Sequence, residues 1–130
     1  MKIIFNKKLK YSPASHENPL HRVAFKKIIF TQKDIMKDGK IQMINWAKLI
    51  KGKSFVPHYH EDMEEIFIII KGRATITVDK EKKDLNSGDS VLIPPKAIHE
   101  MKNISYSDVE YLVIGITLGI GGKTIVTKKL

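Results

Sequence analysis

The sequence contains no cysteine among its 130 residues. A chain without cysteine forms no disulfide and offers no thiolate, so any metal ion bound here would need nitrogen and oxygen ligands. Because disulfides are rare in the cytosol, a cytoplasmic location is compatible with this composition and is the one we expect. Long apolar runs are also missing. Residues 1–5 are apolar apart from Lys2, which is too short a run for a signal peptide, and we expect no membrane-spanning segment.

Arginine is scarce, although the chain is basic. Lysine and arginine together number 23 against 14 acidic residues, giving a formal net charge of +9, yet Arg22 and Arg73 are the only arginines. The lysines occur in pairs scattered along the chain, at the expected strand ends and turns. Nucleic-acid surfaces concentrate their basic residues in one patch, so we interpret these lysines as solvated surface and do not expect nucleic acid as a partner.

Amphipathic helix patterns are absent too, and short apolar or alternating runs between turn residues take their place. In residues 73–78, for example, polar and apolar positions alternate, so Ala74, Ile76 and Val78 should face a core while Thr75 and Thr77 face away. This pattern predicts an all-β, single-domain antiparallel sandwich or barrel of six to ten strands. The expected strands are 23–30, 41–50, 65–70, 73–78, 82–85, 90–93, 97–102, 109–116 and 124–127.

The first part of the chain differs from the rest. Residues 11–22 contain two prolines and several turn formers, which favour irregular structure. We therefore predict an N-terminal arm at 1–22 and a β-barrel domain at 23–130. His16 and His21 in this arm could reach a metal ion, but isolated loop histidines are more often polar surface.

His58 and His60 are the strongest candidates for metal ligands. Side chains two residues apart in a strand point to the same face, so both imidazoles can approach one ion. Carboxylates follow closely, and the distance from His60 alone allows either Glu64 or Glu65 to be the acidic ligand. A further ligand must come from elsewhere in the chain.

Two patterns bounded by glycine organise the middle of the sequence. The first contains Gly52, His58, His60, Glu65 and Gly72, and the second contains Gly88, Pro94, Lys96, His99 and Asn103. Together they resemble the two signatures of the cupin superfamily, in particular its small single-domain microbial members. The resemblance implies a jelly-roll β-barrel that holds a metal ion through His58, His60, Glu65 and His99. It selects Glu65 rather than Glu64 by the distance to Gly72, and places Asp62, Met63 and Glu64 in a connecting turn.

Lys96 departs from the cupin pattern, which usually has glycine there. Lysine does not favour positive φ as glycine does, which leaves open whether this turn keeps the family's backbone conformation.

Strand parity indicates the surroundings of the metal. Met101 shares a face with His99, and Phe67 and Ile69 share one with Glu65, so we predict that these three residues line an apolar pocket. A general base would then be a metal-bound water or hydroxide, or one of Tyr59, Glu64 and Glu100, whose positions favour an outward orientation. Three imidazoles and one carboxylate suit a divalent transition metal, namely iron, manganese, nickel, zinc or copper.

The resemblance also implies a function and an assembly. It predicts a metal-dependent enzyme acting on a small anionic or polyhydroxylated molecule, with dioxygenase, decarboxylase or sugar-phosphate isomerase chemistry. The alternative is a non-catalytic domain that binds or senses a small molecule. Small cupins usually form homodimers through the arm and one sheet, and the outward-facing Ile66, Ile68 and Ile70 agree with such a homodimer.

Overall fold

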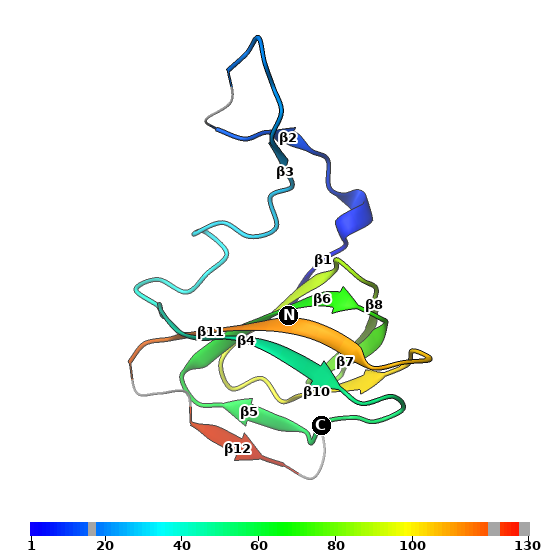
Figure 1. Ribbon diagram of the computed structural model, residues 1–130. Helices are drawn as coiled ribbons and strands as arrows, with labels where there is room; N and C mark the ends of the chain where they lie inside the picture. Colours follow the sequence, from blue (N-terminus) through cyan, green and yellow to red (C-terminus); the bar gives the residue numbers. More distant parts are fainter. Residues whose placement is uncertain (16–17, 120–122, 128–130) are drawn as a thin grey trace.

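The computed structural model describes residues 1–15, 18–119 and 123–127, which form two five-stranded antiparallel sheets facing each other (Figure 1). The first sheet contains, in spatial order, β1 (Lys2–Ile4), β9 (Ser90–Ile93), β6 (Met63–Lys71), β11 (Val109–Thr117) and β4 (Lys40–Leu49). The second contains β12 (Thr124–Val126), β5 (His58–His60), β10 (His99–Asn103), β7 (Ala74–Val78) and β8 (Glu81–Leu85). The predicted all-β, antiparallel jelly-roll barrel is confirmed.

The main hydrophobic core lies between the two sheets. On β7 the alternating residues Ala74, Ile76 and Val78 are buried, as predicted, and on β11 Val109 and Tyr111 point the same way. Burying an aliphatic side chain of this size contributes about 1.5–3 kcal/mol. The core therefore joins the sheets and fixes which face of each strand points inward.

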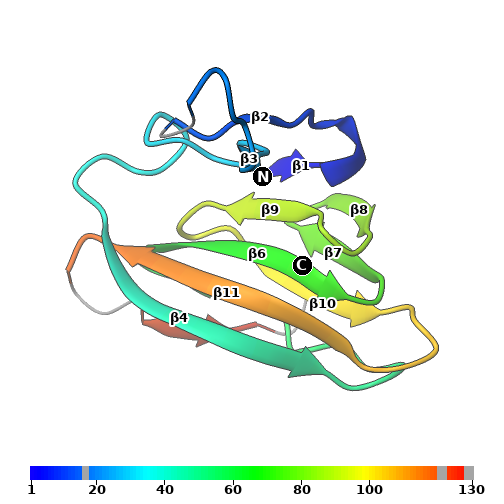
Figure 2. The same ribbon diagram turned by 45° about the horizontal axis from the view of Figure 1, so that its top comes forward.

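A second, smaller cluster lies on the outer face of the first sheet. Ile66, Leu92 and Ile116 are buried there, and Phe30 and Met36 from the segment before β4 pack against them. This covering explains the nearly continuous apolar sequence of β6, since the strand has neighbours on both faces. Figure 2 shows β9, β6, β11 and β4 as one layer, with the segment that leads to β4 passing at its edge.

The strand expected at 23–30 is wrong for most of its length. Only β3 (Phe25–Lys26) forms, paired with β2 (Ser12–Pro13). Val23 and Ile28, outside that pair, are 86% and 53% exposed. A run of β-branched and aromatic residues becomes a strand only where a partner strand and a packing surface exist. In this run only two residues pair with another strand. Met63 and Glu64, expected in a turn, instead begin β6.

The N-terminal residues form an edge strand of the first sheet, because β1 pairs with β9. A short 3₁₀ turn, η1 (Asn6–Lys8), follows, and the β2–β3 pair then stands away from the two sheets in Figure 1 before the chain returns to β4. The division into an arm at 1–22 and a barrel at 23–130 stays a prediction. Within the described ranges the chain forms no helix long and apolar enough to cross a membrane.

Candidate metal centre

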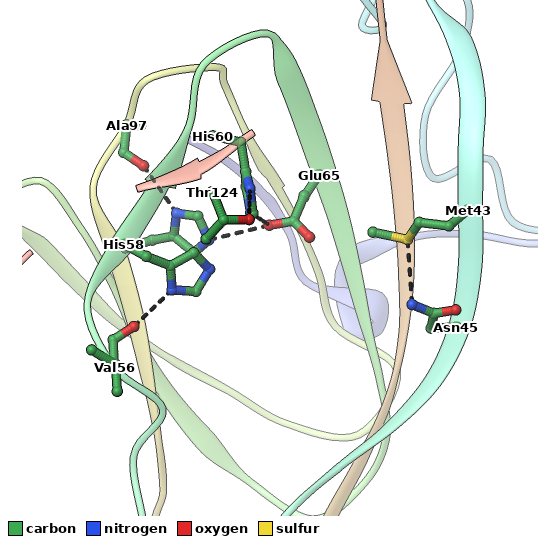
Figure 3. Close-up of polar contacts among 9 residues, drawn as sticks. Met43, Asn45, Val56, His58, His60, Glu65, Ala97 and Thr124 are labelled. Atoms are coloured by element: carbon green, nitrogen blue, oxygen red, sulfur yellow. Dashed lines mark hydrogen bonds and ion pairs between the residues drawn. The ribbon is translucent and has the colours of Figure 1, made fainter. Parts of the chain in front are cut away.

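Three strands bring the candidate ligands together. His58 on β5 lies directly opposite His99 on β10 in the second sheet, and their ring centroids are 4.4 Å apart. His60 follows two residues after His58 and faces the same side, with its ring 5.0 Å from that of His58. Glu65 reaches them from β6 in the opposing sheet (Figure 3). The site therefore spans the two layers of the barrel.

The four side chains converge closely. One possible ligand atom from each of His58, His60, Glu65 and His99 lies within 4.8 Å of the other three. The Oε1 atom of Glu65 is 2.8 Å from Nε2 of His60 and 3.2 Å from Nε2 of His99. All except the half-buried His58 are buried.

The two distances from Oε1 of Glu65 are close to those expected around a bound transition-metal ion. Around an ion with metal–nitrogen and metal–oxygen bonds of about 2.1 Å, neighbouring ligand atoms lie about 3.0–3.4 Å apart. The donor chemistry also fits. The carbonyl of Ala97 lies 2.9 Å from Nδ1 of His99 and can only accept a hydrogen bond, so a neutral His99 turns the lone pair of Nε2 toward the carboxylate of Glu65. Two electron-rich atoms facing each other favour a cation between them.

The electrostatics of the candidate ligands are compatible with binding a cation. Burial alone would raise the pKa of Glu65, but its close contacts with the imidazoles of His60 and His99 outweigh burial and lower the pKa to about 2. Burial lowers the pKa of His58, because a half-buried imidazole resists taking up a proton. At neutral pH Glu65 is thus ionised and His58 neutral, which are the states that metal ligands require.

Aromatic side chains surround the cluster. Phe67, predicted to line the pocket, lies with its ring 6.1 Å from that of His99. Ile69 and Met101, also predicted to line it, are fully buried in the main core, and the lining role of all three stays a prediction.

The sequence analysis missed two other aromatic residues. The ring of Phe55 is 5.3 Å from that of His58, and Tyr111 packs against Phe67 with centroids 5.4 Å apart. Burial, and then the negative charge of Glu65, raise the pKa of the Tyr111 hydroxyl. Strand parity on β11 could have identified Tyr111 as inward-facing. Phe55 lies in the loop before β5, where no strand alternation predicts the direction of its side chain.

The remaining candidates lie elsewhere. His21 is an exposed arm residue outside the cluster, and His16 falls outside the described residues. Glu64 faces away from Glu65, as predicted, but it is buried rather than at the surface. Its Oε1 accepts a hydrogen bond of 2.7 Å from the backbone N–H of Met36. Glu100 pairs with Thr77 on β7 and lines a groove on the outer face of the second sheet. Tyr59 is partly exposed on β5.

Two further residues of the second pattern support the site through the backbone. Lys96 adopts a φ of 68°, so lysine keeps the left-handed conformation that glycine would favour there. Its N–H donates to the carbonyl of His60 at 2.7 Å, which ties this turn to a ligand strand. Asn103 is buried and donates through Nδ2 to the carbonyls of Leu49 and Ser107. Its role is to fix loops rather than to bind a ligand.

Comparison with known proteins identifies related chains. The family model described as "Cupin domain" matches residues 45–115. An uncharacterised protein from Methanocaldococcus jannaschii is 35% identical over 97 residues, which cover 60% of this chain and 78% of that protein. Quercetin 2,3-dioxygenase from Bacillus subtilis is 31% identical over 83 residues, covering 64% of this chain but only 22% of the enzyme. The crystal structure of a cupin protein from Bacteroides fragilis superimposes with a TM-score of 0.54 at 25% identity, covering 73% of this chain and 86% of that one.

Proposed function

The chain belongs to the cupin family, and we propose that it uses His58, His60, Glu65 and His99 to hold a divalent transition metal at which a small molecule is bound or transformed. The observation that carries this proposal is the convergence of three imidazoles and one carboxylate from two sheets on one point. A buried group of this kind is costly unless its members are paired with one another or with an ion.

The chemistry of the site supports a class of substrate. A divalent ion, whether iron, manganese, nickel, zinc or copper, would supply Lewis acidity or redox activity there. Glu65 offsets one of its two positive charges, so the site favours an anionic molecule or one with several hydroxyl groups. Phe55 and Phe67 flank the histidines and give the site apolar surroundings. We propose dioxygenase, decarboxylase or sugar-phosphate isomerase chemistry, and the likeness to part of quercetin 2,3-dioxygenase supports testing oxygen-dependent cleavage first.

A non-catalytic binding or sensing role is the second candidate, and one observation favours it. Among the described residues, the other buried carboxylates have structural partners. Glu64 binds the N–H of Met36, and Asp89 binds the N–H groups of Asn6 and Asn86. Tyr111 is an inward-facing ionisable group beside the cluster, because it packs against Phe67 and the charge of Glu65 contributes to raising its pKa. Such a site offers few groups for proton transfer beyond the ligands and a bound water.

We also propose that the protein forms a homodimer. Ile44 and Trp46 on the outer face of β4 are 61% and 63% exposed. Leu20 of the arm and the following Val23 and Phe25 are exposed as well. A second copy of the chain would bring an apolar arm to an apolar sheet face, which buries both.

Substitutions of the two adjacent residues Glu64 and Glu65 test the metal site. Metal content is measured on protein purified without a histidine tag. We expect stoichiometric metal in the native protein, a loss of at least tenfold in affinity in Glu65→Gln, and native affinity in Glu64→Gln. Glutamine at 64 can still accept the hydrogen bond from Met36, so this variant is a matched control. The double variant His58→Ala, His60→Ala should lose the metal, and undiminished content there would refute the site.

Turnover then separates the two candidate functions. Each restored metal is assayed for oxygen consumption with diketones and catechols, for decarboxylation of oxalate, and for isomerisation of sugar phosphates. Turnover that Glu65→Gln abolishes supports an enzyme. Saturable binding of such a molecule to the metal-loaded protein, without turnover, supports the binding role.

A further inference from the structure

Each histidine of the candidate metal centre has a partner on its Nδ1 atom. For His58 the partner is the carbonyl of Val56 at 2.7 Å, and for His99 it is the carbonyl of Ala97 at 2.9 Å. Both carbonyls lie two residues before the histidine that they bind. His60 differs, because its Nδ1 contacts the hydroxyl Oγ1 of Thr124 at 3.1 Å, a side chain 64 residues away (Figure 3).

The partner on Nδ1 decides what Nε2 offers to the cluster. A carbonyl only accepts, so it selects the tautomer with hydrogen on Nδ1 and a free lone pair on Nε2. The hydroxyl of Thr124 can do the same for His60 by accepting from Nδ1–H, and it also fixes the rotation of the ring. Partners of this kind raise the affinity of metal-binding histidines, typically 10- to 100-fold.

Thr124 lies on β12, the edge strand of the second sheet. This strand pairs with β5 in a register that sets Thr124 opposite His60 and Val126 opposite His58. Backbone bonds from Thr127 to Pro57 and from Glu61 to Lys123 extend the pairing at both ends. Thr124 and Val126 are exposed and Ile125 is half-buried, so hydrophobic burial contributes little to holding the strand. A segment with few buried contacts opens more easily than the core.

We propose that Thr124 is a positioning residue for His60, and that docking of β12 and binding of the metal ion strengthen each other. This inference rests on the proposed metal site. Metal binding needs His60 held in one orientation, and the docked strand supplies the hydroxyl that holds it. By linkage, the factor by which the docked strand raises metal affinity equals the factor by which the metal stabilises the docked strand.

The test compares two substitutions at the same position. Thr124→Val keeps the shape of the side chain and a high strand propensity but removes the hydroxyl, whereas Thr124→Ser keeps the hydroxyl. Zn²⁺ and Co²⁺ affinities are measured by competition with a chelating dye. We expect Thr124→Val to bind both ions 10- to 100-fold more weakly and Thr124→Ser to remain within about threefold of the native protein. Thr127→Val is the control, because the Thr127 hydroxyl faces the carbonyl of Pro57 rather than a histidine.

Hydrogen exchange gives a second readout that a purely structural role would not move. In the native protein Zn²⁺ should slow exchange at the amides of 58–61 and 123–127. The protection that Zn²⁺ gives should be smaller in Thr124→Val, whereas Thr124→Ser should retain it. Native affinity and native protection by Zn²⁺ in Thr124→Val would overturn the positioning role and leave the metal site intact. If the native protein binds neither ion stoichiometrically, the metal site itself is refuted and this inference with it.

Discussion

Lys96 holds a backbone conformation that lysine rarely adopts, with φ of 68° at an exposed position beside a ligand strand. The left-handed region costs a non-glycine residue about 1–2 kcal/mol, whereas glycine costs about 0.4–1 kcal/mol through the entropy of the unfolded chain. We therefore expect Lys96→Gly to raise the free energy of unfolding by about 0.5–1 kcal/mol. Urea denaturation measures this as a higher midpoint with an unchanged slope.

Asp79 is a matched control for this prediction. Its φ of 53° is also left-handed, but its Oδ1 accepts a hydrogen bond of 3.1 Å from the N–H of Ile98. Glycine at 79 relieves the strain and removes the hydrogen bond, so Asp79→Gly should give no net gain. A loss of stability in Lys96→Gly would show that the lysine side chain has a stabilising role larger than the strain.

Single residues also show where sequence reasoning succeeded and where it stopped. Strand parity put His58 and His60 on one face, and the structure agrees. Parity could not choose between Glu64 and Glu65 or supply His99, and the cupin spacing did both. Neither argument could reveal Thr124, because its contact with His60 depends on how the last strand docks against β5, 64 residues earlier in the chain.

At the scale of elements, the segment 30–36 is held to the outer face of β6 by one notable hydrogen bond. The N–H of Met36 donates to Oε1 of the buried Glu64 at 2.7 Å. Removing the acceptor leaves a half-buried N–H without its partner, which costs about 1–3 kcal/mol. We expect Glu64→Ala to lose about that much stability and to speed hydrogen exchange at Met36, while Glu64→Gln stays near native. Equal losses in both variants would show that charge, rather than the acceptor, matters.

The strand predictions succeeded or failed according to the neighbours of each strand. Residues 73–78 and 109–116 became β7 and β11 because each lies between two partner strands and packs on the core. Residues 23–30 have a similar composition, but only Phe25 and Lys26 found a partner. Propensity describes how well a residue fits a sheet, and the position of the sheet is set by the whole chain.

At the scale of the whole molecule, the outer face of the first sheet is covered unevenly. Toward β9, Ile66 and Leu92 are buried beneath the chain's own segment 30–36. Toward β4, Trp46 lies opposite Leu112 in the ladder and Ile44 lies opposite Ile114, and both β4 side chains remain exposed. The covered half needs no partner. The uncovered half, together with the exposed side chains of Leu20, Val23 and Phe25, is the surface that we assign to the proposed homodimer.

This assembly predicts a specific effect of charge on β4. Ile44→Lys places an ammonium group in the proposed contact, and truncating or charging a central apolar residue weakens an interface by about 2 kcal/mol or more, at least tenfold in the dissociation constant. We expect sedimentation velocity to show a native dimer and a largely monomeric Ile44→Lys at micromolar concentration.

Tyr106→Lys is the control, because Tyr106 is 96% exposed in the loop before β11 and lies outside this face. A monomeric native protein would contradict the dimer. An Ile44→Lys variant that dimerises as well as the native protein would show that the interface does not include this face of β4. The net charge of +9 opposes the approach of two copies, so added salt should strengthen the association, in contrast to an interface built on opposite charges.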